Sequence, residues 1–202
     1  MFDPNSRLLA VFFVLCAMLC APLPSSAAAK SSSAGDQTFN VRVSPFGLIV
    51  GWVNVDADIR IGDFITVGPS LTYFNLSASA TTNADSSSVK ATRLGVRGNY
   101  FGDGVFTDSW YVSPILAAIR EEITVRSGSL SASATPSGLE LSLLGGYHWF
   151  WENGFNLCLG GGVVTTNLGN TTKITYSDGT TTDLGNYRST GVALDFMLGW
   201  AF

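Results

Sequence analysis

The sequence predicts an all-β fold: an eight-stranded antiparallel up-and-down transmembrane β-barrel, preceded by a cleaved signal peptide. In the last segment of the chain, large apolar residues alternate with small or charged ones as far as Phe202, which is the period of a β-strand. Earlier segments repeat this pattern, and the connections between them alternate in length. Only 13% of the residues are charged, whereas 12% are aromatic and 22 are glycine, which favours many strands and turns.

The N-terminus has the pattern of a secretory signal peptide. Arg7 precedes an apolar run from Leu8 to Cys20, and small residues follow as far as Ala29. The run is shorter than the ~20 residues that a membrane-spanning helix needs, so we expect cleavage near Ala29. Cys158 is then the only cysteine left, which excludes an internal disulfide. The expected division is a signal peptide at 1–29, a short polar segment at 30–38 and a barrel domain at 39–202.

Eight strands are expected in the barrel domain. The segment from Phe39 to Ile61 should hold two of them, with a short reversal near Gly51, because single-chain bacterial barrels have even strand numbers. One long strand in this segment, which would give seven in all, is the alternative. The other strands are expected at Phe64 to Leu76, Lys90 to Phe101, Trp110 to Arg126, Gly138 to Phe150, Phe155 to Thr166 and Gly191 to Phe202.

The connections between these strands differ in length in a regular way. Short periplasmic turns and long external loops are typical of outer-membrane barrels, so both termini are expected in the periplasm. The last long loop contains Ser177-Asp178-Gly179-Thr180 between two short β-like runs, which predicts an extra hairpin that projects beyond the membrane. The short connections are Gly62-Asp63, Phe101 to Ser109 and Trp151 to Gly154, and the long ones are Ser77 to Val89, Ser127 to Ser137 and Asn167 to Asn186.

Aromatic residues cluster beside the short connections, as expected of a girdle at the lipid interface. Tyr73, Phe74 and Tyr187 would form a sparser girdle at the other end. The residues beside the short connections are Phe64, Tyr100, Phe101, Trp110, Tyr111, Trp149, Phe150, Trp151, Phe155, Trp200 and Phe202.

Alternation along each strand predicts which side chains face lipid. Val53 to Ile61 alternates between apolar residues, assigned to lipid, and polar ones, assigned to the lumen. The same rule sends Tyr111, Ile115 and Ile119 to lipid and makes Glu121 an exception beyond the outer surface. Mixed charges in a narrow barrel predict paired, packed side chains. The expected lumen charge network is Asp56, Asp58, Arg60, Arg93, Arg97, Arg120, Glu122, Glu140 and Asp195.

Small inward residues and one histidine are the other features assigned to the interior. Six glycines would make room either for long arginine side chains or for a narrow cavity. His148 would lie inward at the periplasmic rim, far from the outer leaflet where a lipid-modifying enzyme acts. No catalytic, cofactor-binding or metal-binding residues are predicted. The glycines are Gly95, Gly146, Gly160, Gly162, Gly191 and Gly199.

Three stretches resemble small bacterial outer-membrane barrel families, the outer membrane protein A/X-type barrels and outer membrane protein W relatives. They are the segment Ser44 to Asp56 with Pro45 and Gly47, the run Gly68 to Tyr73, and the closing Gly199 to Phe202. The resemblance implies a monomer in the bacterial outer membrane, whose partners are outer-membrane lipids, periplasmic chaperones and the barrel assembly machinery. It also implies a C-terminal assembly signal made of Leu194, Phe196, Leu198, Trp200 and Phe202.

Three functions remain open on the sequence alone. The first is a structural or surface-interaction barrel that acts through Ser/Thr-rich loops. The second is a narrow pore for small or hydrophobic solutes, and the third, more remote, is a lipid-modifying enzyme. Nucleic acid is not an expected partner, because the net charge of -4 lacks the basic footprint that phosphate binding needs.

Overall fold

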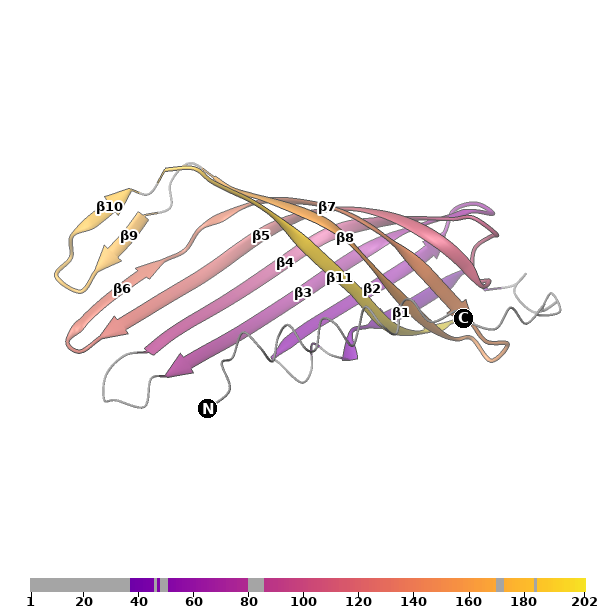
Figure 1. Ribbon diagram of the computed structural model, residues 1–202, viewed down its shortest axis with the longest axis horizontal. Helices are drawn as coiled ribbons and strands as arrows, with labels where there is room; N and C mark the ends of the chain where they lie inside the picture. Colours follow the sequence, from indigo (N-terminus) through magenta and orange to yellow (C-terminus); the bar gives the residue numbers. More distant parts are fainter. Residues whose placement is uncertain (1–36, 46, 48–50, 80–85, 170–172, 184) are drawn as a thin grey trace. The chain divides into compact units, whose positions relative to one another are not determined.

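The computed structural model describes residues 37–45, 47, 51–79, 86–169, 173–183 and 185–202. Over these residues the chain is all-β and forms a closed barrel of eight antiparallel strands within one compact unit (Figure 1). The expected signal peptide and nearly all of the 30–38 segment lie outside the described residues. The barrel strands are β1 (Phe39–Val43), β2 (Trp52–Arg60), β3 (Ile65–Ser79), β4 (Ser86–Phe101), β5 (Ser109–Ser127), β7 (Ser137–Phe150), β8 (Phe155–Leu168) and β11 (Tyr187–Ala201).

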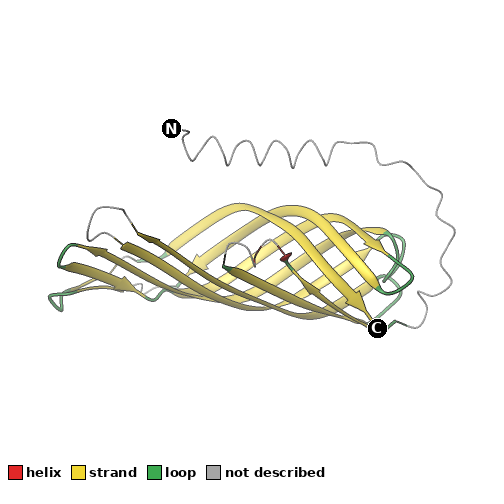
Figure 2. Ribbon diagram, turned by 90° about the horizontal axis from the view of Figure 1, so that it is seen from below, coloured by secondary structure: helices red, strands yellow, loops and turns green. Residues whose placement is uncertain are grey.

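The barrel closes where the last strand pairs with the first. β11 pairs antiparallel with β1, with Trp200 opposite Val41. The backbone N–H of Thr38 donates to the carbonyl oxygen of Phe202 (2.8 Å), and the N–H of Phe202 donates to the carbonyl of Phe39 (2.7 Å). Closure of this kind removes the unpaired edges that an open sheet would leave. Figure 2 shows that the strands, which form the barrel wall, run obliquely around it.

The first hairpin has two strands, as predicted, so the seven-strand alternative is wrong. β1 ends at Val43 and β2 begins at Trp52, and the connection between them is longer than the tight reversal expected at Gly51. Pro45 and Gly47 are helical, and Gly51 has a φ of 79°, a conformation that favours glycine. The six later strands lie close to the predicted ranges.

Three further strands, β6 (Leu130–Ala134), β9 (Lys173–Tyr176) and β10 (Thr181–Asp183), lie outside the barrel ring. β6 pairs with β5, β9 with β6, and β10 with β9. Figure 1 places all three at the end of the barrel opposite the C-terminus. We call this the extension sheet: residues 74–79 of β3, 86–91 of β4 and 121–127 of β5, with β6, β9 and β10.

The β9–β10 hairpin confirms the turn predicted at Ser177 to Thr180. Gly179 has a φ of 86°, and the Asp178 carboxylate accepts hydrogen bonds from the N–H (2.9 Å) and hydroxyl (2.6 Å) of Thr180. These two bonds lower the pKa of the Asp178 carboxyl. The pairing of β6 with β9, which joins two long loops into one sheet, has no counterpart among the predictions.

The faces of β2 and β11 follow the predicted alternation. On β11, Val192 is 77% exposed and Leu194 is 59% exposed. Asp195, the next residue after Leu194, is buried on the opposite face. On β2, Ile59 points outward, and Asp56 and Asp58 are fully buried inside. The larger side chains of the predicted assembly signal lie on the outer surface.

The predicted faces of β5 are wrong. Ile115 lies opposite the inward Arg97, and Arg120 lies opposite the outward Thr92, so Tyr111, Ile115, Ala117 and Ile119 point inward. Arg120 and Glu122 therefore point outward, and Glu121 lies on the inward side. Apart from Ser113, which is buried on the inward face, both faces of this strand are apolar between Trp110 and Ile119, and the predicted phase followed the charges at its end. Those charges, Arg120, Glu121 and Glu122, lie beyond the apolar part of the strand.

Phe101, Tyr111 and Phe150 do not belong to the aromatic girdle, because the first two are buried inside the barrel and Phe150 packs against them. Phe74, opposite the inward Ala91, is not part of the outer girdle either. Phe101 packs with Val105 and Phe106, which come from the turn between β4 and β5, and Phe106 contacts Phe150 with ring centroids 5.6 Å apart. We call these four residues the apolar plug; they fill the barrel at the short-turn end.

No helix among the described residues is long and apolar enough to cross a membrane.

Candidate functional site

The interior holds a cluster of five buried charged side chains, which we call the interior charge cluster: Arg42, Asp56, Asp58, Arg97 and Asp195. β2 supplies two carboxylates because Asp56 and Asp58 are two residues apart and so share one face. Arg97 Nη1 lies 2.8 Å from Asp56 Oδ2, and Arg97 Nη2 lies 2.6 Å from Asp195 Oδ2. Arg42 Nη2 lies 2.9 Å from Asp58 Oδ1. Four strands, β1, β2, β4 and β11, are thereby tied together across the barrel.

Neutral polar side chains surround the cluster and complete its hydrogen bonds. Asn99 accepts from Arg97 Nε (2.9 Å) and donates to Asp58 (2.8 Å), and Tyr111 donates its hydroxyl to Asp195 (2.7 Å). Asn40 donates to Asp58 and accepts from Asn156 (2.8 Å). Arg42 Nε and Asp56 Oδ1 have no hydrogen-bond partner among the described residues.

Burial makes this cluster an interlocked unit rather than an ion-conducting surface. Its two guanidinium groups and three carboxylates are at most 3% exposed. Two charges taken out of water are tolerated only when each has close partners, and removal of one partner leaves the other unpaired at a cost of several kcal/mol. The cluster therefore fixes the relative positions of the strands that carry it.

A second ion pair lies closer to the extension sheet. Arg93 Nε is 2.8 Å from Glu140 Oε1, and the hydroxyls of Ser142 (3.3 Å) and Thr166 (3.4 Å) donate to the same carboxylate. Both charged side chains are mostly buried. The interior thus contains two separate layers of paired charge.

Three predicted network residues lie elsewhere. Arg60 contacts Asp63 (3.2 Å) near the short turn after β2, whereas Arg120 and Glu122 are exposed on the outer face of β5. Conversely, Arg42 belongs to the cluster and Tyr111 donates a hydrogen bond to it, but both were missing from the expected network. A signal for Arg42 exists in the alternation Phe39-Asn40-Val41-Arg42-Val43, which places Asn40 and Arg42 on one face of β1.

His148 lies inside the barrel near the apolar plug. Its Nε2 is 3.0 Å from Asn156 Oδ1, and its ring centroid is 4.4 Å from that of Phe150 and 5.7 Å from that of Phe101. The Cys158 thiol is also fully buried, 3.5 Å from Asp195 Oδ2. These surroundings are those of a packed interior histidine and cysteine.

The inward glycines make room for side chains. A Cβ atom at Gly95 would lie 2.6 Å from the Cβ of Ala117, and one at Gly199 would lie 2.6 Å from Arg42 Cγ. Both distances are shorter than real side chains allow, so these positions are already filled. The glycines let the arginine stems and neighbouring strands approach closely, and they leave no channel at these points.

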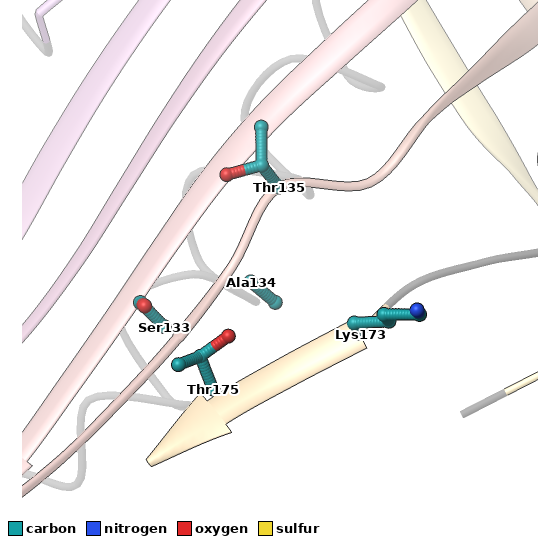
Figure 3. A pocket seen from close by; sticks show the side chains of 5 residues that line it. All are labelled: Ser133, Ala134, Thr135, Lys173 and Thr175. Carbon is teal, nitrogen blue, oxygen red and sulfur yellow. The ribbon is translucent and has the colours of Figure 1, made fainter. Parts of the chain in front are cut away.

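The extension sheet carries an open cleft of about 360 Å³ between β6 and β9 (Figure 3). Ser133, Ala134, Thr135, Lys173 and Thr175 line it. Apart from Ala134 and the cationic Lys173, these are short hydroxyl side chains, and among the described residues no hydrogen bond joins Lys173 to any of the hydroxyls. Among the residues that the structure describes, no group of three histidine, cysteine or acidic side chains is placed to hold a metal ion.

Comparisons with known proteins return no match: no family model, curated protein or solved structure is similar to this chain.

Proposed function

We propose that this chain is an integral barrel of the bacterial outer membrane, with a closed interior and a surface-interaction role at its extension sheet. The observation that carries the proposal is an outer apolar belt around the barrel. Among the described residues, the outward-facing side chains of this belt carry no charge, and the outward-facing Arg120 of β5 and Arg188 of β11 lie at its margin, toward the extension sheet. Its large members include Val53, Ile59, Ile65, Leu71, Leu94, Val96, Val112, Leu116, Leu139, Leu141, Leu143, Val163, Val192 and Leu194, each at least 38% exposed.

The dimensions and polarity of this belt suit a bilayer. On β5 the belt runs from Trp110 to Ala118, and on β7 from Leu139 to Trp149, close to the ~9–11 residues that a tilted membrane strand needs. Arg and Lys facing lipid would each cost ~2–4 kcal/mol at mid-membrane, and the buried charges of this chain point the other way. An apolar exterior around a charged interior is the reverse of a water-soluble barrel.

The closed interior favours a structural and surface role over the pore. The interior charge cluster and the apolar plug occupy successive levels of the barrel, and five of the six inward glycines, all except Gly191, leave no room for a Cβ atom. The lipid-modifying alternative gains no support from His148, which lies beside Asn156 and the plug. The resemblance to outer membrane protein A/X-type and W-like barrels remains part of this proposal.

Single-channel recording on the purified barrel in planar bilayers tests the closed interior. We expect no stable openings at moderate voltage, because ions would have to pass both paired charges and the plug. Discrete, reproducible conductance steps would assign the chain to the narrow-pore class instead. An Arg97→Ala variant serves as a positive control for the recording, since loss of that side chain should loosen the interior.

A further inference from the structure

The extension sheet has one apolar and one polar face. Strand register aligns five side chains in one inward row across five strands: Leu76, Val89, Ile123, Ala134 and Ile174. The neighbouring outward row consists only of hydroxyl residues: Ser77, Ser88, Thr124, Ser133 and Thr175. We call the inward side the apolar extension face.

This face is exposed although it lies beyond the outer apolar belt. Leu76 is 51% exposed, Val125 47%, Leu130 69% and Tyr176 40%. In the proposed orientation these side chains face water rather than lipid. Contiguous exposed apolar surface rimmed by polar residues is typical of an interaction site.

Charge on the apolar extension face is of one sign. Glu121, opposite Ala91 in the register, is the only charged side chain that the described residues place on this face. No hydrogen bond or ion pair of its carboxylate is present among the described residues. The nearest charges on the same side of the sheet, Arg93 and Glu140, are already paired with each other at 2.8 Å. The face therefore offers one unpaired carboxylate and no cation.

We propose that the apolar extension face docks an amphipathic, cationic helix of a partner protein. This inference rests on the proposed function, because it assigns the partner chemistry of the same surface. Five strands about 4.8 Å apart span roughly 19 Å, and a helix about 10 Å wide packs on such a sheet layer. A Lys or Arg at the edge of the helix would meet Glu121.

Two other occupants fit less well. A second copy of this chain, packed face to face, would bring two Glu121 carboxylates into one desolvated interface, where like charges repel. An anionic lipid headgroup would meet the same carboxylate without a Lys or Arg on the described part of the face. A cationic partner is the occupant that complements both the apolar rows and the charge.

The test uses the full folded barrel in zwitterionic lipid nanodiscs, with empty nanodiscs as reference. Two designed helical peptides of about 18 residues share one leucine face and carry either lysine or glutamate on the other. A fluorophore at Ala132→Cys, in a Cys158→Ala background, reports binding. We expect the Leu/Lys peptide to bind at least about tenfold more tightly than the Leu/Glu peptide, with an affinity that falls as salt rises.

The neighbouring glutamates provide a matched pair of variants. Glu121→Gln should weaken binding of the Leu/Lys peptide about fivefold, as expected for one partly exposed ion pair, whereas Glu122→Gln on the polar face should leave it unchanged. Val125→Ser with Leu130→Ser should weaken both peptides through the loss of apolar contact.

Equal binding of the two peptides, or equal effects of the two glutamine variants, would overturn the proposal. So would a dimer in sedimentation that Val125→Ser with Leu130→Ser abolishes, or a label at residue 132 that the free chain already shields. None of these outcomes bears on the outer apolar belt or on conductance, so a failed docking proposal remains distinct from a failed proposed function.

Discussion

Asp56 and Asp195 both contact Arg97 inside the barrel, at 2.8 and 2.6 Å. The loss of that one guanidinium would therefore leave two fully buried carboxylates without their closest cation. Arg97 also donates to Asn99 and lies over the Tyr111 ring, 5.8 Å from its centroid. At the scale of single residues, Arg97 therefore has more partners inside the barrel than any other side chain of β4.

Arg97→Ala should lower the free energy of unfolding by about 3–5 kcal/mol, because it leaves buried carboxylates unpaired. Arg97→Ala combined with Asp195→Ala should cost less than the sum of the two single changes, since the pair is removed together. Urea unfolding of the barrel in detergent measures all three. Arg120→Ala is the control: its exposed guanidinium should change stability by no more than about 0.5 kcal/mol. A large loss of stability for Arg120→Ala would instead support the predicted inward direction of Arg120.

Residue-level prediction succeeded where alternation was unambiguous. Asp56 and Asp58 sit between Val55, Ala57 and Ile59, so their inward direction follows from period two alone. The partners of these carboxylates could not be predicted, because pairing across a barrel depends on a register that no single strand encodes. Arg60 has the same inward phase as Asp58, but it lies at the turn, within reach of Asp63.

At the scale of elements, β5 shows why the phase of a strand can be misread. Its inner residues Ile115 and Ile119 are as apolar as its outer residues Val112 and Leu116, although they lie opposite Arg97 and Arg93 on β4. A charged side chain indicates the inward face of a barrel strand only where the outward face would meet the hydrocarbon layer of a membrane. The pairing of β6 with β9 was equally hidden, since it joins two loops that are distant in sequence.

The last strand should act both as the barrel seam and as an assembly signal. Deletion of Phe202 removes the backbone bonds to Thr38 and Phe39 together with an aromatic ring that is 64% exposed. Phe202→Ala keeps the backbone bonds and removes only the ring. We expect both variants to lower the heat-modifiable folded fraction in cells and to leave protein in the periplasm.

Refolding of the purified chain in detergent separates the two roles. Phe202→Ala should refold nearly as well as the natural sequence there, because no assembly machinery is present. Normal assembly of Phe202→Ala in cells would show that the terminal ring is not part of a signal.

The positions of the connections predict an orientation. A thiol reagent applied to intact cells should label cysteines placed at Asp178 and in the 127–137 connection, because the extension sheet is expected outside the cell. Cysteines at Asp103 and Asn153, in the short turns, should react only after the outer membrane is permeabilised. The reverse labelling pattern would show that the barrel has the opposite orientation in the membrane.

At the scale of the whole molecule, polar and apolar side chains are separated in two ways: between the outside and the inside of the barrel wall, and between successive levels along the barrel. The outer apolar belt surrounds two layers of paired interior charge, the apolar plug lies at the short-turn end, and the extension sheet lies at the other. Of these features, the outer apolar belt would be costly in a water-soluble protein, because its side chains would be exposed to water. All of them are consistent with a strand barrel stabilised by lipid outside and by ion pairs inside.

Spin-label accessibility tests that claim most directly. Labels at Leu141→Cys and Leu143→Cys, in a Cys158→Ala background, should collide with oxygen, which concentrates in lipid, and be shielded from a water-soluble nickel complex. A label at Ser133→Cys, on the polar face of the extension sheet, should show the opposite preference. Nickel accessibility at residues 141 and 143 equal to that at 133, in barrels folded into lipid vesicles, would contradict a lipid-facing belt and with it the membrane-spanning barrel.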